Sequence, residues 1–339
     1  GPGERIEYYK ENTAGGPLII TSENYVKISK RELFGDSFNE TSVIKSTDLG
    51  TKFYIPNYLY LDGVSYAWIL MGNPSNTTPV NINVFLAGEI NDNIVLQPGE
   101  RIEYYKPNVA GGPLVITANQ NIYVSKRELF MGKFNEVNAI SDANLDTKFY
   151  IPNYLFLNDV SHAWILIGNP SATETAQVNV FLLNKINENF TLAPGQRVEF
   201  FKPDVNGGPV EVTSDIPIYT VKRELFGAYF NEVNSLSQQD FGHSFVIPNY
   251  LFVTNLSHAW VLIGNPSSTE TANVRIFLKN NIDEIISLNP GERIEYFKDN
   301  VAGGPMHITS DIDIFVTKRE LFMNKFNEFN AIKYDLVPN

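Results

Sequence analysis

Residues 111–136 read GGPLVITANQNIYVSKRELFMGKFNE, and a close variant of this stretch occurs four times in the chain. The Gly-Gly-Pro turn begins at Gly15, Gly111, Gly207 and Gly303. The Lys-Arg-Glu-Leu-Phe segment begins at Lys30, Lys126, Lys222 and Lys318, and Phe-Asn-Glu at Phe38, Phe134, Phe230 and Phe326. Each series advances by 96 residues without a gain or loss. A fixed period of this length indicates an array of equal structural units.

Within the unit 51–146, short runs of alternating apolar and polar residues are separated by turns rich in Gly and Pro. The runs are rich in Val, Ile, Thr and aromatic residues, which favour strands. We expect seven strands, at 52–61, 66–72, 81–87, 93–97, 101–106, 113–118 and 122–129. Seven short strands fit an immunoglobulin-like sandwich. The predicted fold class is therefore all-β, a tandem array of seven-stranded Ig-like β-sandwich modules with a 96-residue period.

The repeat divides the chain into a half module and three full modules. The half module is 1–50, and modules 1, 2 and 3 are 51–146, 147–242 and 243–339. A half sandwich cannot cover its own hydrophobic face. Two explanations stay open: the chain is cut from a longer array, or another chain completes the half module by strand addition.

Composition narrows the range of partners. The chain has 26 Lys plus Arg against 38 Asp plus Glu, a formal net charge of −12. An acidic surface repels phosphates, so we expect no nucleic acid as a partner. No apolar run approaches the ~20 residues that span a bilayer, so we expect no membrane insertion in this segment. There is no cysteine, which excludes disulfides and thiolate chemistry and leaves the compartment open.

The motifs of module 2 are, in order, Trp164, Ile167-Gly168-Asn169-Pro170, Leu192 to Arg197, Gly207 to Thr213, Arg223-Glu224-Leu225-Phe226 and Phe230-Asn231-Glu232-Val233. They resemble the tandem β-sandwich (Ig-like) repeats of large secreted or surface-anchored proteins of bacteria and archaea. The resemblance implies an extracellular or cell-surface location. It also implies a structural or adhesive function, as part of a rod, stalk, surface layer or filament. Its partners would be neighbouring copies of itself or other surface components.

A large aromatic residue recurs in the most apolar strand of each module, at Trp68, Trp164 and Trp260. In Ala67-Trp68-Ile69-Leu70 both faces of the strand are apolar. This pattern predicts a central strand buried on both sides. We expect the three tryptophans to be structural core residues.

The Arg-Glu pair of the repeated segment suggests an ion pair. Consecutive strand residues face opposite ways, so Arg127 and Glu128 cannot act together. We expect instead a buried or inter-module pair between Arg127 and Glu136, which would fix module orientation. The other copies supply the pairs Arg31 and Glu40, Arg223 and Glu232, and Arg319 and Glu328. An alternative use of the same residues is an isopeptide crosslink from Lys126 to Asn135.

Exposed aromatic residues suggest a second function. In 101–106, Ile102 and Tyr104 alternate with polar residues and Tyr105, so Tyr105 is the more exposed ring. The candidate ligand-facing aromatics are Tyr9, Tyr105, Phe201 and Phe297, and Asn57-Tyr58 is a further candidate for sugar contact. The alternative function is a multivalent carbohydrate-binding protein, in which weak repeated sites gain by avidity. Glycans would then be partners.

No motif predicts an enzyme or a resident cofactor. His162 and His258 are in register, but the first module has Tyr66 there, so the copies do not share a catalytic base. No nucleophile elbow, metal-ligand cluster or phosphate-binding glycine loop is found. Acidic inter-module loops such as Asp142 to Asp146 leave Ca²⁺ at the module junctions as an open alternative. The leading interpretation is a linear rod of sandwiches joined by short linkers.

Overall fold

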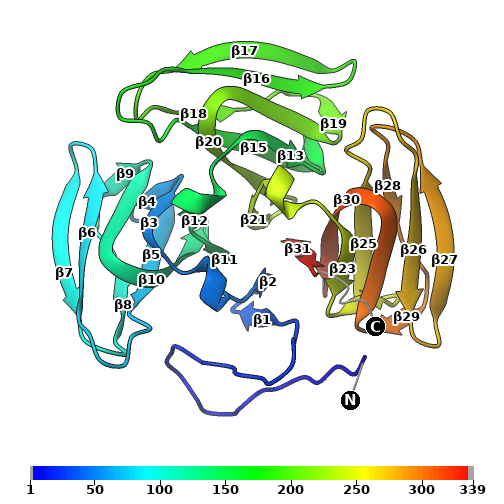
Figure 1. Ribbon diagram of the computed structural model, residues 1–339, viewed down its shortest axis with the longest axis horizontal. Coiled ribbons are helices and arrows are strands. Elements are labelled where there is room, and N and C mark those ends of the chain that lie inside the picture. The colour runs from blue at the N-terminus through cyan, green and yellow to red at the C-terminus, as the bar shows by residue number, and fades with distance from the viewer. Residues whose placement is uncertain (1–2, 335–339) are drawn as a thin grey trace.

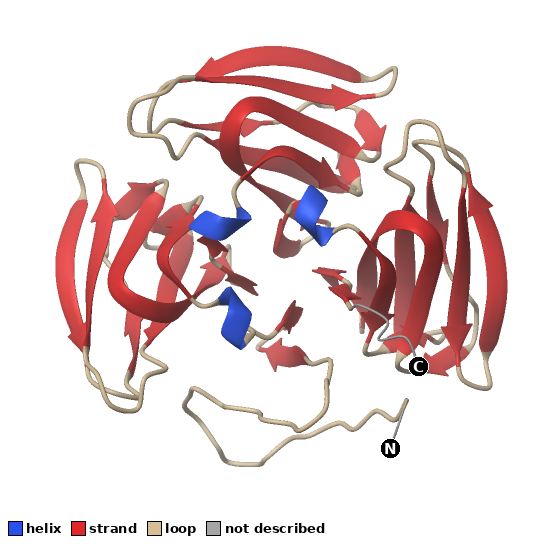
Figure 2. Ribbon diagram, in the orientation of Figure 1, coloured by secondary structure: helices blue, strands red, loops and turns tan. Residues whose placement is uncertain are grey.

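The computed structural model describes residues 3–334, which consist almost entirely of strands and loops (Figure 2). The helices in this part are the single-turn 3-10 helices η1 (Ser46–Asp48), η2 (Asp142–Asn144) and η3 (Gln238–Asp240). The predicted all-β array of β-sandwich modules is confirmed. Every strand pairing in the described part joins strands of the same module.

The strands of module 1 are β3 (Gly50–Ile55), β4 (Tyr58–Tyr60), β5 (Ser65–Gly72), β6 (Val80–Leu86), β7 (Ile90–Leu96), β8 (Arg101–Tyr104), β9 (Val109–Gly111), β10 (Leu114–Phe130), β11 (Lys133–Asn138) and β12 (Ile140–Ser141). Those of module 2 are β13 (Asp146–Ile151), β14 (Tyr154–Leu157), β15 (Ser161–Gly168), β16 (Ala176–Leu182), β17 (Ile186–Leu192), β18 (Arg197–Phe200), β19 (Val205–Gly207), β20 (Val210–Phe226), β21 (Tyr229–Asn234) and β22 (Leu236–Ser237).

Module 3 repeats the pattern with β23 (Gly242–Ile247), β24 (Tyr250–Phe252), β25 (Ser257–Gly264), β26 (Ala272–Leu278), β27 (Ile282–Leu288), β28 (Arg293–Tyr296), β29 (Val301–Gly303), β30 (Met306–Phe322), β31 (Lys325–Asn330) and β32 (Ile332–Lys333). The half module contributes one hairpin, β1 (Ser29–Phe34) and β2 (Ser37–Ser42). No strand is present in residues 3–28.

One long strand belongs to both sheets of each sandwich. In module 1 the sheets are β7-β6-β10-β3-β12 and β11-β10-β5-β8, all antiparallel. The first part of β10, 114–118, pairs with β6 and β3, and its second part, 123–130, pairs with β5 and β11. The register with β3 shifts between Thr117 and Ile122, where the strand bends from one sheet to the other.

The expected strands differ from the observed ones at three places. The expected strands 113–118 and 122–129 are the two parts of the continuous β10. The expected strand 52–61 is interrupted near Pro56, which has no N–H to donate to a ladder. The strands β9, β11 and β12, which are short or follow a tight turn, were not expected from the sequence.

The three tryptophans are not the core residues that the sequence predicted. Ala67, Ile69 and Met71 of β5 are fully buried in the sandwich core, and because side chains alternate along a strand, Trp68 points away from it. Trp164 and Trp260 are half-buried in the same way. The outer face of this strand is apolar because it contacts a neighbouring module. In module 2, Leu166 of β15, together with Tyr219 and Val221 of β20, packs against Tyr54 and Ile140 of module 1.

The modules do not line up as a rod. They lie around a common centre, and the second strands of the four hairpins, β2, β11, β21 and β31, meet there (Figure 1). The half module closes against module 3: the Phe38 and Phe322 rings are 5.0 Å apart, and the Lys318 Nζ is 2.6 Å from a Glu40 carboxylate oxygen. The expected linear rod is therefore corrected to a ring, because each hairpin projects to one side of its module.

The Gly-Gly-Pro turn supplies a test of the packing. A Cβ on Gly208 would lie 2.1 Å from the Pro152 carbonyl oxygen, so alanine requires the backbone to move. We expect Gly208→Ala to lower the free energy of unfolding by about 1–3 kcal/mol or more, as measured by urea titration. Gly16 is the matched control, since the half module lacks the counterpart of Pro152 and a Cβ there is 3.5 Å from Arg101. An equal loss for Gly16→Ala would contradict the explanation.

Candidate functional site

A buried cluster of four charged side chains joins module 1 to module 2. Lys126 and Glu128 come from β10, Arg223 from β20 and Glu232 from β21. The Lys126 Nζ is 2.9 Å from Glu128 and 2.7 Å from Glu232. Arg223 is 2.8 Å from Glu128 and 3.0 Å from Glu232. Each charge thus contacts two opposite charges, one from its own module and one from its neighbour.

Neutral partners complete the cluster. The Ser65 hydroxyl donates to Glu128 at 2.8 Å, and the Lys126 amine donates to the Asn57 carbonyl at 3.2 Å. Lys126 and Glu128 are no more than 1% exposed. Burying ions is costly unless they are paired and hydrogen-bonded, and here both conditions are met.

The Lys-Arg-Glu sequence follows directly from this arrangement. Side chains alternate along a strand, so Lys222 and Glu224 face one way and Arg223 the other. Arg223 joins the cluster with module 1, whereas Lys222 and Glu224 form the next cluster with module 3. One tripeptide therefore serves two junctions.

The same cluster recurs around the ring. Between modules 2 and 3 it consists of Lys222, Glu224, Arg319 and Glu328, with ion-pair distances of 2.7, 2.7, 2.8 and 3.1 Å. Between module 3 and the half module it consists of Lys318, Glu320, Arg31 and Glu40, at 2.6, 2.6, 3.1 and 3.4 Å. Ser161 and Ser257 again donate to the first glutamate of each cluster.

The fourth junction, between the half module and module 1, is open to solvent. Lys30 is 2.7 Å from Glu32 and 2.9 Å from Glu136, and Arg127 is 3.0 and 3.1 Å from the same two residues. The Lys30 side chain is nevertheless 43% exposed, against 1% for Lys126. The serine and carbonyl that complete the other clusters come from the first half of a module, which the half module lacks.

The charges of the clusters control the ionisation of their carboxylates. Burial alone would raise the pKa of Glu128, but Arg223 and Lys126 outweigh it and hold the pKa below its ordinary value. The pKa of Glu224 is lowered in the same way by Arg319 and Lys222 against burial. Glu128 and Glu224 therefore stay ionised near neutral pH.

Aromatic and amide groups surround the clusters near the ring centre. The Arg223 guanidinium lies over Phe130 of module 1 at 5.1 Å and over Phe230 of its own module at 4.7 Å, within the range of cation–π attraction. The four Phe-Asn-Glu asparagines are buried at the centre. The Asn39 and Asn231 amides both donate to the Asn327 side-chain oxygen at 3.2 Å. These contacts link hairpins that are 96 or more residues apart.

The structure brings together all four arginine–glutamate pairs expected from the sequence. The distances are 3.4 Å for Arg31 and Glu40, 3.1 Å for Arg127 and Glu136, 3.0 Å for Arg223 and Glu232, and 3.1 Å for Arg319 and Glu328. Each pair lies within one hairpin. The contacts between modules are made by Arg with the glutamate of the preceding Lys-Arg-Glu, and by the lysine of that Lys-Arg-Glu with the Phe-Asn-Glu glutamate of the next module. The Lys126 amine donates to Glu128, Glu232 and the Asn57 carbonyl. The crosslink from Lys126 to Asn135 stays a prediction.

The candidate ligand-facing aromatics lie on the surface. Tyr9, Tyr105, Phe201 and Phe297 are 80, 50, 57 and 49% exposed. In the full modules the ring stacks on a second aromatic of β4, β14 or β24. The pairs are Tyr105 with Tyr60 at 5.3 Å, Phe201 with Phe156 at 5.9 Å and Phe297 with Phe252 at 5.3 Å. We call each of these pairs an aromatic step.

Asn57 and Tyr58, which the sequence predicted to be exposed, are buried. Tyr58 is fully buried in the core and Asn57 is 5% exposed. Burial raises the pKa of Tyr58 to about 12. The short strand β4 is paired with β9 there, so its side chains alternate between the core and the aromatic step.

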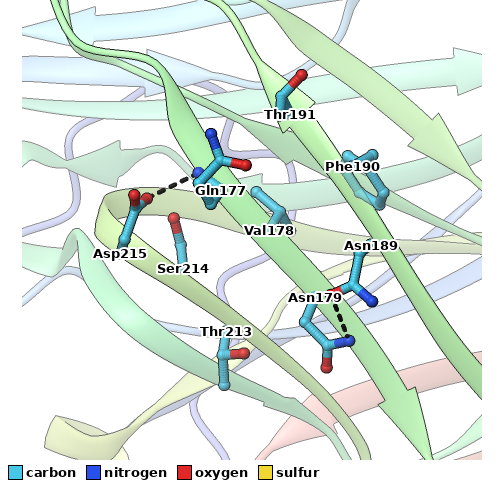
Figure 3. Close-up of a pocket in the computed structure, with 9 residues that line it drawn as sticks. All are labelled: Gln177, Val178, Asn179, Asn189, Phe190, Thr191, Thr213, Ser214 and Asp215. Atoms are coloured by element: carbon cyan, nitrogen blue, oxygen red, sulfur yellow. Dashed lines mark hydrogen bonds between the residues drawn. The ribbon is translucent and has the colours of Figure 1, made fainter.

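The surface of the described residues is hollowed in places. One hollow, of about 360 Å³, lies on β16, β17 and β20 and is lined by polar side chains together with Val178 and Phe190. In it Asp215 accepts from the Gln177 backbone and Asn179 donates to Asn189 (Figure 3). The position of Asn179 is Arg275 in module 3, so the lining differs there. Another hollow, of about 340 Å³, lies between modules 1 and 2, beside Trp164 and Arg197.

The described residues do not form a cluster of metal-binding side chains. Residues 3–334 contain no group of three or more His, Asp or Glu side chains that could hold an ion. Asp142, in the loop suggested for Ca²⁺, accepts from the Tyr54 hydroxyl at 2.8 Å and lies 3.5 Å from Lys52. No helix among these residues has the length and apolar character needed to cross a membrane.

The fold and the charged junctions define an all-β repeat protein whose modules are locked into a ring. No family model, curated protein or solved structure matches the chain.

Proposed function

We propose that this protein is a non-catalytic structural or adhesive component of the cell exterior, which holds one repeated surface in a fixed arrangement around a ring. The observation that carries the proposal is the charged junction. Its recurrence between successive modules fixes their relative orientation, so that the modules act as one rigid body. A rigid assembly of equal modules suits load-bearing or multivalent contact within a layer, stalk or filament.

Location outside the cell rests on the resemblance of the repeat to those of secreted and surface-anchored proteins. The partners would be further copies of this chain or other surface components. The acidic excess of −12 supports a protein or glycan partner over a nucleic acid.

Brief protease treatment of intact cells of the source organism tests the proposal. We expect the chain to be released or cleaved while a cytoplasmic marker stays intact. Protection of the chain until the cells are lysed would overturn the extracellular assignment.

A second candidate function is multivalent carbohydrate binding, which the aromatic steps favour. Each step presents a half-exposed ring that is stacked on a second ring, a rigid apolar surface against which a sugar ring packs. Three steps on a rigid ring would raise a weak affinity by avidity, by about 10²- to 10⁴-fold.

The carbohydrate proposal predicts a graded loss of binding on a glycan array. Phe201→Ala in the full chain should weaken binding, and the triple variant Tyr105→Ala, Phe201→Ala, Phe297→Ala should abolish it. Phe181→Ala is the matched control, an exposed aromatic of module 2 outside the aromatic steps, and should bind like the parent chain. Absence of binding by the parent chain to every glycan would remove this candidate and leave the structural proposal standing.

A further inference from the structure

The half module exposes residues whose counterparts form the core of every full module. Leu18 and Ile20 are 72 and 52% exposed, whereas their counterparts Leu114 and Ile116 are fully buried. Val26 is 54% exposed and its counterpart Ile122 is fully buried. Residues 3–28 lie at the open side of the ring (Figure 1). This is a concentrated apolar surface, of the kind that marks a site of association.

The full modules show what covers this surface. Leu114 to Thr117 pair with β3, and Val115 to Ala118 pair with β6 on the other side. The second part of β10 pairs with β5. All the covering strands, β3 to β7, belong to residues 50–96, the first half of the module. The half module has the second half of the repeat and no such cover among the described residues.

The open fourth junction independently indicates the same missing segment. Its four charges are already paired as in the buried clusters. The groups it lacks are the counterparts of the Ser65 hydroxyl and the Asn57 carbonyl, both from the first half of a module. A segment that supplied them would also bury Lys30.

We propose that the open half module is a docking surface for one further first-half segment of this repeat, equivalent to residues 51–96, which enters from the carboxyl end of module 3. Bound there, it completes a fourth sandwich and a fourth buried junction. The chemistry of the occupant is set by the three filled examples. It has alternating apolar residues at the positions of Phe53, Ile55, Ile69 and Ile82, and a serine at that of Ser65.

The path of the chain at the other junctions indicates that the added segment enters from the carboxyl end of module 3. There the chain runs from the last short strand of one module through a 3-10 turn into the first strand of the next, as from β12 through η2 to β13. The corresponding strand β32 ends beside the half module, where the Lys27 amine donates to the Lys333 carbonyl at 3.4 Å and lies over the Tyr334 ring. A segment that continues from this point reaches the open surface directly.

A fusion tests the proposal. A second copy of residues 51–96 is added after residue 339, and amide hydrogen exchange of residues 18–34 is followed by mass spectrometry. We expect exchange of 18–26 to slow by about 100-fold or more, because these amides would join a sandwich that opens only as a unit. The control fusion has the same length and carries aspartate at the added counterparts of Ile69 and Ile82, which prevents burial.

Substitution of the half module supplies a second readout. In the parent chain Ile20→Ala should leave the urea midpoint nearly unchanged, whereas in the fusion it should lower the midpoint as Ile116→Ala does. Equal exchange in the fusion and its aspartate control would overturn the proposal. Dimerisation of the parent chain with protection of residues 18–26 would also overturn it, in favour of a second copy as the occupant.

Discussion

Lys126→Met is expected to lower the free energy of unfolding by about 3–5 kcal/mol, the cost of leaving buried charge uncompensated. Lys126 is 1% exposed and is shared between Glu128 and Glu232. Methionine keeps much of the side-chain volume but removes the charge, so the two carboxylates would have only Arg223 between them. The loss should appear as a lower midpoint in urea, followed by tryptophan fluorescence.

The open fourth junction provides the matched control. Lys30 makes the same two ion pairs, with Glu32 and Glu136, but is 43% exposed. Water replaces the lost partner there, so Lys30→Met should cost about 1 kcal/mol or less. Similar losses for the two variants would show that burial of the junction does not control its energy.

The sequence predicted the local structure well because the information is local. The 96-residue step, the turns and the alternation of apolar residues indicate most of the strands of each sandwich, but not the short strands β9, β11 and β12. The expected pairing of Arg127 with Glu136 needs only a hairpin that brings the two strand positions opposite each other, as observed.

The ring was not predictable from the same patterns. A repeat period gives the size of a module but not the small rotation between successive modules, and that rotation decides between a rod and a ring. Trp68 was misplaced for a related reason. An apolar residue on the outer face of a strand is explained equally by a second core layer and by a neighbouring module, and sequence alternation does not separate them.

Of the four residues in the cluster, Lys126 was the hardest to predict from the sequence. It is present in all four copies, and that invariance within the chain was the available signal. Its partners are Glu128 on its own strand, Glu232 of the next module and the backbone carbonyl of Asn57. A backbone acceptor carries no residue-specific signature, and Glu232 is 106 residues away.

The junctions also explain where the net charge of the protein lies. Each cluster contains two basic and two acidic residues, so none contributes to the formal charge of −12. The acidic excess is therefore carried by the rest of the molecule, largely its outer surface. Two copies of the ring repel each other through their acidic, hydrated outer surfaces unless a specific contact joins them.

Acid is expected to weaken all three buried junctions together. Burial would raise the pKa values of Glu128, Glu224 and Glu320, but the neighbouring arginine and lysine outweigh it and lower them below the ordinary value of 4.5. A carboxyl whose pKa is lower in the folded chain stabilises it above the unfolded pKa. This stabilisation is lost as the pH falls through the folded pKa. The urea midpoint should therefore be nearly constant near neutrality and fall steeply below about pH 4.5.

Glu224→Gln separates this effect from general acid unfolding. The variant should be less stable than the parent at pH 7, because Arg319 and Lys222 lose a charged partner. It should lose less on acidification, because one of the three linked carboxyls is gone, so the two stability curves should approach each other as the pH falls below 4.5. Added salt should change the parent curve little, since buried pairs are weakly screened. Parallel curves for the parent and the variant would mean that the acid sensitivity arises at other carboxylates than those of the junctions.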